Sequence, residues 1–423
     1  MKRILCALMC VVMLATFFAC NSSDNRSEYS LLKGYERAED IPTFDFVSGE
    51  IQLPEEYNNY TSGISSFSFK LLGSMATNKD NVVVSSLSMV NALSILANGA
   101  YDNTKKEIRT TVSGVDMDLL NGANYYLNSR LTAFNGDSAK LTLADALWCD
   151  DSFDVKTAFL QNIVNYYNAE VMRVDLGASD TKDKVNGWIS DTTGGKLTST
   201  VDKISEETLM LMVSAIFMED EWVTPYLSSQ IKEGTFHADG ADVKADFMTS
   251  TENYISTDYA HGFVKSFKNL PLKFAAIMPA EDVTAEEFAQ GLTAAKWQAL
   301  LESQQATNFC TASMPSFEIS YKNDVTSVFR ALGINDAFNS AKADFSQMSN
   351  TGKPYVSGVV HDTFIQIGPA GAKAGAATVT DVKGNDVSSD IPSVTFDKPF
   401  VFVIYDNESG VPVFTGVVNN PAK

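Results

Sequence analysis

The chain has 423 residues, of which 45% are hydrophobic, and this is enough apolar material for one large globular domain or two smaller ones. Its formal net charge is −20, and no run rich in Lys or Arg follows the first few residues. Because phosphate binding requires clustered cations, this composition excludes nucleic acid and other polyanions as expected partners.

The first 19 residues are predicted to be a signal peptide and are left out of the reasoning on the fold. Lys2 and Arg3 give a basic start, and residues 4–18 form an apolar run shorter than the roughly 20 residues that span a bilayer. The run ends in FFAC, which resembles the motif of bacterial lipoproteins, so we predict lipidation at Cys20. The alternative is an ordinary secretory signal cleaved near Ala19.

Lipidation would anchor an exported protein to the bacterial cell envelope, at the outer membrane, on its periplasmic or its surface face. Residues 20–56 are polar and charged without periodic apolar positions, which predicts a flexible tether. Residues 57–423 contain no stretch typical of an interdomain linker and are predicted to form a single domain. For the two remaining cysteines, Cys149 and Cys310, buried free thiols are favoured over a disulfide.

Two early segments have the apolar spacing of a helix: Ile64, Phe67, Leu71 and Met75 in the first, and Met89, Leu93 and Leu96 in the second. Strands are predicted at residues 82–84, 141–148 and 205–218, the last of them a central strand that follows a capped turn. Residues 400–405 and 411–418 are apolar runs on either side of DNESG, which predicts a hairpin. Helices dominate the first third and strands the last, so the fold class is α+β.

The residues that catalysis or metal binding requires are sparse. The chain has three histidines, His237, His261 and His361, and none lies within a helical turn of another. There is no HExxH or CxxC motif, no GxSxG nucleophile elbow and no glycine-rich phosphate loop. We therefore predict no catalytic residues, no metal and no cofactor.

Residues 369–392 form an unusual connection between two apparent strands, because structureless loops longer than about 15 residues are uncommon in compact domains. In an extended chain, one parity holds only uncharged and mostly small residues: Ala372, Ala374, Ala376, Thr378, Thr380 and Val382. The other parity holds every charge: Lys373, Gly375, Ala377, Val379, Asp381 and Lys383. The stretch therefore has the pattern of a strand of about 11 residues with one buried face, whereas a floppy surface loop is the alternative.

This segment resembles the hinge and reactive loop of inhibitory serpins, a family whose loop insertion is a known case of strand addition. The resemblance extends from about Tyr57 to Lys423. Its ordered motifs are NVVVSSLSMVNAL at 81–93, GAYDNT at 99–104, DALW at 145–148, YYNAEV at 166–171, VNGWIS with TGGK at 185–196, ADFS at 343–346, His361, KPFVF at 398–402 and GVVNNP at 416–421.

The resemblance implies three β-sheets, eight or nine helices and an exposed reactive loop. It also implies a suicide-substrate inhibitor, not an enzyme, that traps a serine protease, or alternatively a cysteine protease, as an acyl complex when its cleaved loop inserts into the central sheet. The hinge residues are Gly371, Ala372, Ala374, Gly375, Ala376, Ala377 and Thr378. The cluster that lets the sheet open matches Ser85, Ser88, Ser214 and His361.

Several positions depart from the family pattern. Pro369 stands where the family usually has Glu, Ala372 where Thr or Ser is common, and Asp145 where Asn is usual. Ser86 replaces Pro, and Ser214 stands where Asn is common. None of these changes argues strongly against inhibition. The alternative function is that of a non-inhibitory serpin acting as a binding module. A third alternative, outside the family, is a surface glycan-binding lipoprotein.

The target protease is the open question. The candidate scissile region comprises Val382, Lys383, Gly384, Asn385, Asp386 and Val387. Counting from Gly371 places the bond after Asn385, and counting back from Pro399 places it near Ser388. Lys383 suits a trypsin-like protease and is slightly favoured, whereas Val382 and Val387 suit an elastase-like one. We expect a monomer.

Overall fold

The computed structural model describes residues 28–41, 55–198, 200–204, 208–305, 307–351, 353–372 and 391–422. These residues form nine α-helices: α1 (Tyr57–Met75), α2 (Ser86–Gly99), α3 (Asp102–Val112), α4 (Met117–Thr132), α5 (Thr157–Tyr166), α6 (Thr181–Thr192), α7 (Ala285–Gly291), α8 (Ala294–Glu302) and α9 (Thr326–Ala331). In this part of the chain no helix combines the length and apolarity needed to cross a membrane.

A six-stranded sheet forms the centre of the molecule. Its strands, in spatial order, are β10 (Phe317–Asp324), β11 (Val359–Ile367), β4 (Met210–Glu221), β2 (Lys140–Asp150) and β3 (Glu170–Val174), with β12 (Gly371–Ala372) also paired to β4. We call it the central sheet. The strand predicted at 205–218 is β4, which begins later than predicted and is apolar for most of its length because both of its faces are covered.

The other strands form a nine-stranded sheet: β1 (Val82–Val84), β15 (Pro412–Val418), β14 (Phe400–Asp406), β8 (Leu272–Pro279), β7 (Ala260–Ser266), β6 (Ala241–Ser256), β9 (Phe309–Pro315) and β13 (Ser393–Thr395) in that order, with β5 (Ile231–Ala238) beside β6. The long strand β6 pairs with β5 and β9 over most of its length and with β7 only at its last residues. The second and third sheets that the resemblance implied are therefore continuous through β6.

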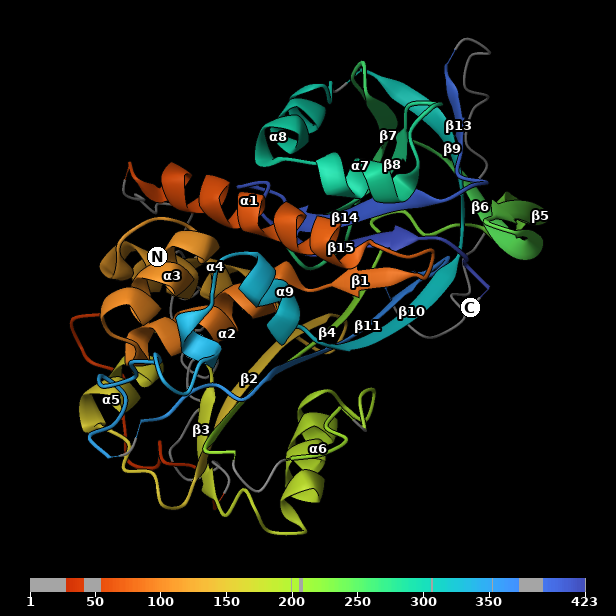
Figure 1. Ribbon diagram of the computed structural model, residues 1–423. Coiled ribbons are helices and arrows are strands. Elements are labelled where there is room, and N and C mark those ends of the chain that lie inside the picture. Colours follow the sequence, from red (N-terminus) through yellow and green to blue (C-terminus); the bar gives the residue numbers. More distant parts are fainter. Residues whose placement is uncertain are drawn as a thin grey trace, which may run out of the picture.

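Helices cover the two faces of the central sheet unequally (Figure 1). On one face, which we call the inner face, α1 and α2 join the sheet in the main hydrophobic core. On the other, α6 packs Val185 and Ile189 against Trp148 and its neighbours in a separate, smaller core. Every residue of α2 is buried, as expected of a helix that is apolar on all sides. The predicted α+β class, both early helices and the C-terminal hairpin are confirmed.

Part of the segment predicted to be a tether lies against the domain instead. The amide of Leu31 donates to the carbonyl of Val171 at 2.8 Å, and the amide of Arg173 donates to the carbonyl of Tyr29 at 2.8 Å. Leu32 is fully buried. Residues 28–41 were assigned to the tether because polar composition dominates locally, but pairing of their backbone with the edge strand β3 fixes them.

Both cysteines of the domain are buried free thiols, as predicted. They lie in different sheets, Cys149 in β2 and Cys310 in β9. Burial raises the pKa of each thiol to about 12, so both thiols stay protonated at neutral pH.

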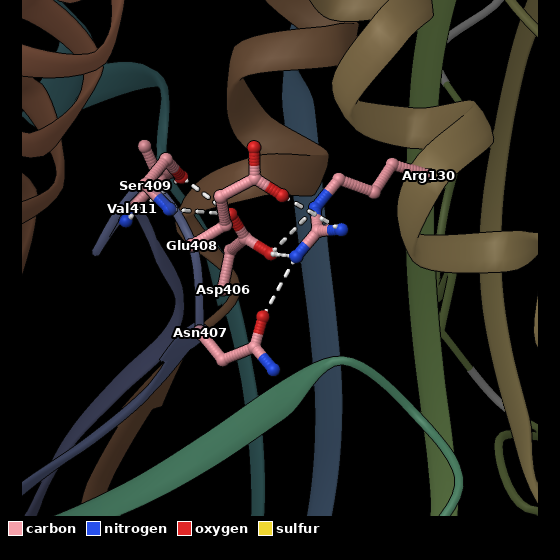
Figure 2. Close-up of polar contacts among 6 residues, drawn as sticks. All are labelled: Arg130, Asp406, Asn407, Glu408, Ser409 and Val411. Carbon is pink, nitrogen blue, oxygen red and sulfur yellow. Dashed lines mark hydrogen bonds and ion pairs between the residues drawn. The ribbon is translucent and has the colours of Figure 1, made fainter. Parts of the chain in front are cut away.

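Arg130 links α4 to the turn between β14 and β15 through hydrogen bonds and ion pairs (Figure 2). Its Nε donates to Asp406 Oδ1 at 3.1 Å, its Nη2 donates to Asn407 Oδ1 at 2.7 Å, and its Nη1 lies 3.0 Å from Glu408 Oε2. Asp406 Oδ2 accepts bonds from the amide and hydroxyl of Ser409. The Arg130 side chain is 12% exposed and that of Asp406 is 1% exposed, so this pair is largely shielded from water.

Replacing Arg130 with Met is expected to lower the free energy of unfolding by about 2–4 kcal/mol, because it leaves the Asp406 carboxylate buried without its cation. Glu408→Gln is the control: its side chain is 56% exposed, and its loss is expected to matter by less than about 1 kcal/mol. The urea midpoints of both variants measure the difference. Equal losses would show that the buried pair is not the source of the stability.

Candidate functional site

The candidate site is the seam between β4 and β11 in the central sheet. On one side of β4, β2 pairs along almost its whole length, from Glu219 to Met210. On the other side, β11 runs parallel to β4 and pairs only with residues Met212 to Ile216. Among the described residues, the C-terminal part of β4 is therefore paired on this side by β12 alone. The seam is half closed.

The start of the predicted hinge occupies the unclosed end of the seam. Gly371 and Ala372 form β12 and pair antiparallel with Glu221 and Asp220 of β4. The side chain of Ala372 is 1% exposed and belongs to the main core on the inner face. These two hinge residues are thus already strand residues of the central sheet.

Only glycine fits at position 371. Its φ is +147°, and a Cβ there would lie 2.1 Å from the carbonyl oxygen of Asp220. Any side chain would push the hinge away from β4, because the obstacle is backbone and cannot rotate aside. The close approach therefore explains the hinge glycine in physical terms.

Two aromatic residues just after β4 form hydrogen bonds with the backbone of residues 368–370, which precede the hinge. The indole Nε1 of Trp222 donates to the carbonyl of Gly368 at 2.9 Å, and its amide donates to the carbonyl of Ala370 at 2.8 Å. The amide of Tyr226 donates to the carbonyl of Pro369 at 2.9 Å. Pro369, one of the departures from the family pattern, is thus accommodated because only its carbonyl is needed.

The buried ammonium group of Lys265 packs against the rings of both aromatic residues. The Nζ of Lys265 lies 4.5 Å from the ring centre of Tyr226 and 5.7 Å from that of Trp222, and it forms an ion pair with Glu252. The Ser250 hydroxyl donates to Glu252 at 2.6 Å. Charge pairing and cation–π contact together fix the rings that hold the hinge.

The predicted opening cluster, Ser85, Ser88, Ser214 and His361, lies deeper along the same seam. All four residues are fully buried, and His361 pairs in register with Ser214 across the seam. Ser85 caps α2: its Oγ accepts the amide of Ser88 at 3.3 Å, and its own amide donates to His361 Nε2 at 3.1 Å. The cluster thus links the start of α2 to both strands of the seam.

The contacts of His361 define its protonation state. Because Nε2 accepts from the Ser85 amide, the ring proton of the neutral imidazole lies on Nδ1, which has no hydrogen-bond partner among the described residues. The Thr363 hydroxyl lies 2.6 Å from the same Nε2 and acts as a second donor. Burial lowers the pKa of His361 to about 3, so the ring is neutral at physiological pH.

On the face that carries α6, which we call the outer face, the segment that follows α6 is bonded to β11, the second strand of the seam, and to β10 beside it. The Thr200 hydroxyl donates to Asp362 of β11 at 2.7 Å, and Lys322 of β10 donates to Asp202 at 2.7 Å. Burial raises the pKa of Asp362, whereas the Thr200 bond lowers it.

The remaining site residues of the sequence analysis lie outside the described part of the chain. They are the hinge residues Ala374, Gly375, Ala376, Ala377 and Thr378, the candidate scissile residues Val382, Lys383, Gly384, Asn385, Asp386 and Val387, and Cys20. Three residues that hold the site were missed: Thr363, Trp222 and Tyr226. Strand alternation could have found Thr363, two residues after His361 on the same face, but nothing local indicates that Trp222 and Tyr226 contact the hinge.

Among the described residues, no three His, Cys, Asp or Glu side chains gather in a way that would hold a metal ion. What the arrangement provides is a half-closed seam, a strand already entering it, and an uncharged polar cluster beneath. The hydroxyls and the neutral imidazole of this cluster can exchange hydrogen-bond partners without moving a charge.

Comparisons with known proteins point to one family. Residues 62–421 match the family described as serpin (serine protease inhibitor). An uncharacterized serpin-like protein of Thermococcus kodakarensis is 26% identical over 85% of each chain, and the alpha-1-antiproteinase of Rattus norvegicus is 25% identical over 91% of this chain and 94% of its own. The crystal structure of the thermophilic serpin tengpin in its native state is 30% identical, with a TM-score of 0.84, and covers 92% of this chain and 99% of its own.

Proposed function

The chain belongs to the serpin family, whose members are in general protease inhibitors and not catalytic enzymes, and on that premise we propose that it is an inhibitory serpin. A target protease attacks the reactive loop as a substrate and forms an acyl-enzyme. The cleaved loop then inserts into the seam between β4 and β11 and carries the bound protease away before deacylation. The chain performs no catalysis itself.

The observation that carries this proposal is the pairing of Gly371 and Ala372 with β4. Extending that register residue by residue would set Ala374 opposite Met218, Ala376 opposite Ile216 and Thr378 opposite Ser214, and Val382 would reach Met210. Residues 371–382 thus match the 12 residues of β4. Lys383 is the first residue beyond the strand.

The register also explains the parity of the loop sequence. Ala372 faces the main core, so every second residue after it would face the same way in an extended strand. These are the uncharged residues through Val382, whereas Lys373, Asp381 and Lys383 would face the side of α6. A strand of this pattern fits the seam without burying a charge in the main core.

The driving force would come from replacing the short pairing of β4 with β11, which covers Met212 to Ile216, by two longer ladders on either side of an inserted strand. A native state that leaves such pairing unmade is metastable and is held by a kinetic barrier. Insertion completes the ladder on both sides of the new strand, at a net gain of about 1 kcal/mol for each hydrogen bond.

The partner is a serine protease, trypsin-like if Lys383 is the recognised residue and elastase-like if Val382 or Val387 is. We also propose that the protein is exported and held at the bacterial cell envelope by a lipid on Cys20, and that it acts as a monomer. The FFAC motif at residues 17–20 supports this placement.

Mixing the protein with trypsin or elastase tests the proposal. On a denaturing gel we expect a covalent band at the summed mass, because the acyl bond survives denaturation. A protease whose catalytic serine is replaced by alanine is the control and gives no such band. If both active proteases yield only cleaved protein, the alternative of a non-inhibitory binding module replaces the proposal.

A further inference from the structure

A row of three polar side chains crosses three adjacent strands of the central sheet. Asp145 of β2 pairs in register with Ser214 of β4, and Ser214 pairs in register with His361 of β11. All three are buried, with at most 4% of any residue exposed. We call these residues the seam row; two of them belong to the opening cluster, whereas Asp145 does not.

Each member of the seam row has one polar atom without a hydrogen-bond partner among the described residues: Asp145 Oδ1, Ser214 Oγ and His361 Nδ1. Unpaired buried polar atoms are rare, and each costs about 1–3 kcal/mol. These three positions are consecutive in register, two of them across the seam and Asp145 one strand beyond it, and they mark a layer whose hydrogen bonding is incomplete in the closed state. Opening the seam would let water or an entering strand satisfy them.

The three side chains project to the same face of the sheet. Alternate residues of β2, β4 and β11 on either side of them, including Leu147, Met212 and Val359, belong to the main core. The row therefore lies in the layer between the sheet and α2. It does not contact the outer face, where Asp362 is bonded to Thr200.

No second charge balances Asp145 in this layer. From α2 the facing groups are Ser85, Ser88 and Asn91, and from β11 they are the neutral His361 and Thr363. The charged groups on the other neighbouring elements are bonded elsewhere. Arg173 of β3 donates to the carbonyl of Phe153, and Arg130 of α4 is paired with Asp406.

Because of this isolation, the charge state of Asp145 depends on pH in a physiological range. Burial raises the pKa of its carboxyl to about 7. Ser214 and Asn91 lie close enough to lower it, but burial is the larger effect. His361 is neutral throughout this range, so Asp145 is the one member of the row that titrates.

We infer that Asp145 controls how readily the seam opens: its neutral carboxyl keeps β4 and β11 closed, and its ionised carboxylate favours their separation. This regulation rests on the proposed function, because it acts on the same seam. The family residue at this position is usually Asn, which cannot titrate, so the control would be a property of this chain.

The direction with pH follows from proton binding. The closed sheet holds the proton of Asp145 more tightly than an open, hydrated one, so the closed state is favoured at low pH. The free-energy preference for the closed sheet falls as pH rises towards about 7, the pKa of Asp145 in the closed state. Above that pH the preference no longer changes. Opening is therefore slow in acid and fast in mild base.

A synthetic peptide with the sequence of residues 371–382 measures opening without any protease, because it enters the seam only when the sheet parts. We expect its rate of incorporation into the intact protein to rise about tenfold or more between about pH 5.5 and 8. In Asp145→Asn, the rate is expected to be nearly independent of pH. Asp151→Asn removes an exposed carboxylate just past the end of β2 and is expected to keep the wild-type profile.

The comparison of variants is necessary because other groups also change charge with pH: the bond to Asp242 raises the pKa of His237, and burial lowers the pKa of His261. Identical profiles for wild type and Asp145→Asn would overturn the inference and leave the proposed function standing. Absence of peptide incorporation into every protein at every pH would instead contradict the proposed function. A thermal midpoint that falls with rising pH in wild type but not in Asp145→Asn supports the titration of this carboxyl independently.

Discussion

Cleavage of the loop that follows Ala372 is expected to raise the midpoint of thermal unfolding by roughly 20 °C or more. After subtracting the bonds between β4 and β11 that must break, the freed strand would add about fifteen backbone hydrogen bonds to the central sheet, each worth about 1 kcal/mol. Calorimetry of intact and cleaved protein measures the shift, and N-terminal sequencing of the released fragment locates the cut.

An increase of this size requires a new strand between β4 and β11 and not merely the loss of a loop. Removing a loop without insertion changes stability little, because loop-closure entropy depends only weakly on loop length. A cleaved protein that melts within about 2 °C of the intact one would contradict insertion, while the assignment of the fold would remain.

Ala376→Asp is expected to convert the inhibitor into a substrate. In the register set by Gly371 and Ala372, residue 376 lies opposite Ile216 and faces the main core, where an unpaired carboxylate costs several kcal/mol. Slower insertion lets the protease complete hydrolysis, so the yield of covalent complex is expected to fall roughly tenfold or more.

Lys373→Asp is the matched control, because it places the same group on the other parity, at a position that already carries a charge. Its side chain would face the α6 side opposite Glu219, which is only partly buried, and the yield of complex is expected to stay near that of wild type. Titration of active protease against each variant gives both yields. If the effects of the two variants were exchanged, the register would be wrong by one residue.

The local pattern of apolar residues was sufficient to predict a helix or strand whose burial is determined by its own sequence. The spacing of Ile64, Phe67, Leu71 and Met75 predicted α1, because these side chains form one buried stripe. The run from Met210 to Phe217 predicted a strand buried on both faces, although the boundary was early by five residues. Family motifs added Ser85, Ser88 and His361, which the structure brings together at the seam.

Contacts between distant parts of the chain could not be predicted in this way. The bonds from Trp222 to Gly368 and Ala370 join positions almost 150 residues apart, and no pattern near Trp222 reveals them. Residues 29–31 were assigned to a tether for the same reason, since their partners are backbone groups of β3. Asp145 was noted as a departure from the family, but its place beside Ser214 follows only from strand register.

The segment at residues 29–31 also affects how molecules meet one another. An exposed edge strand offers unpaired amides and carbonyls to the loops of other copies, which is a common route to aggregation. Here the edge of β3 is already occupied by the chain's own backbone, with Ser30 bridged to Met172. If the copies are concentrated in two dimensions by the lipid anchor proposed above, this margin of the sheet would be protected from intermolecular polymer growth.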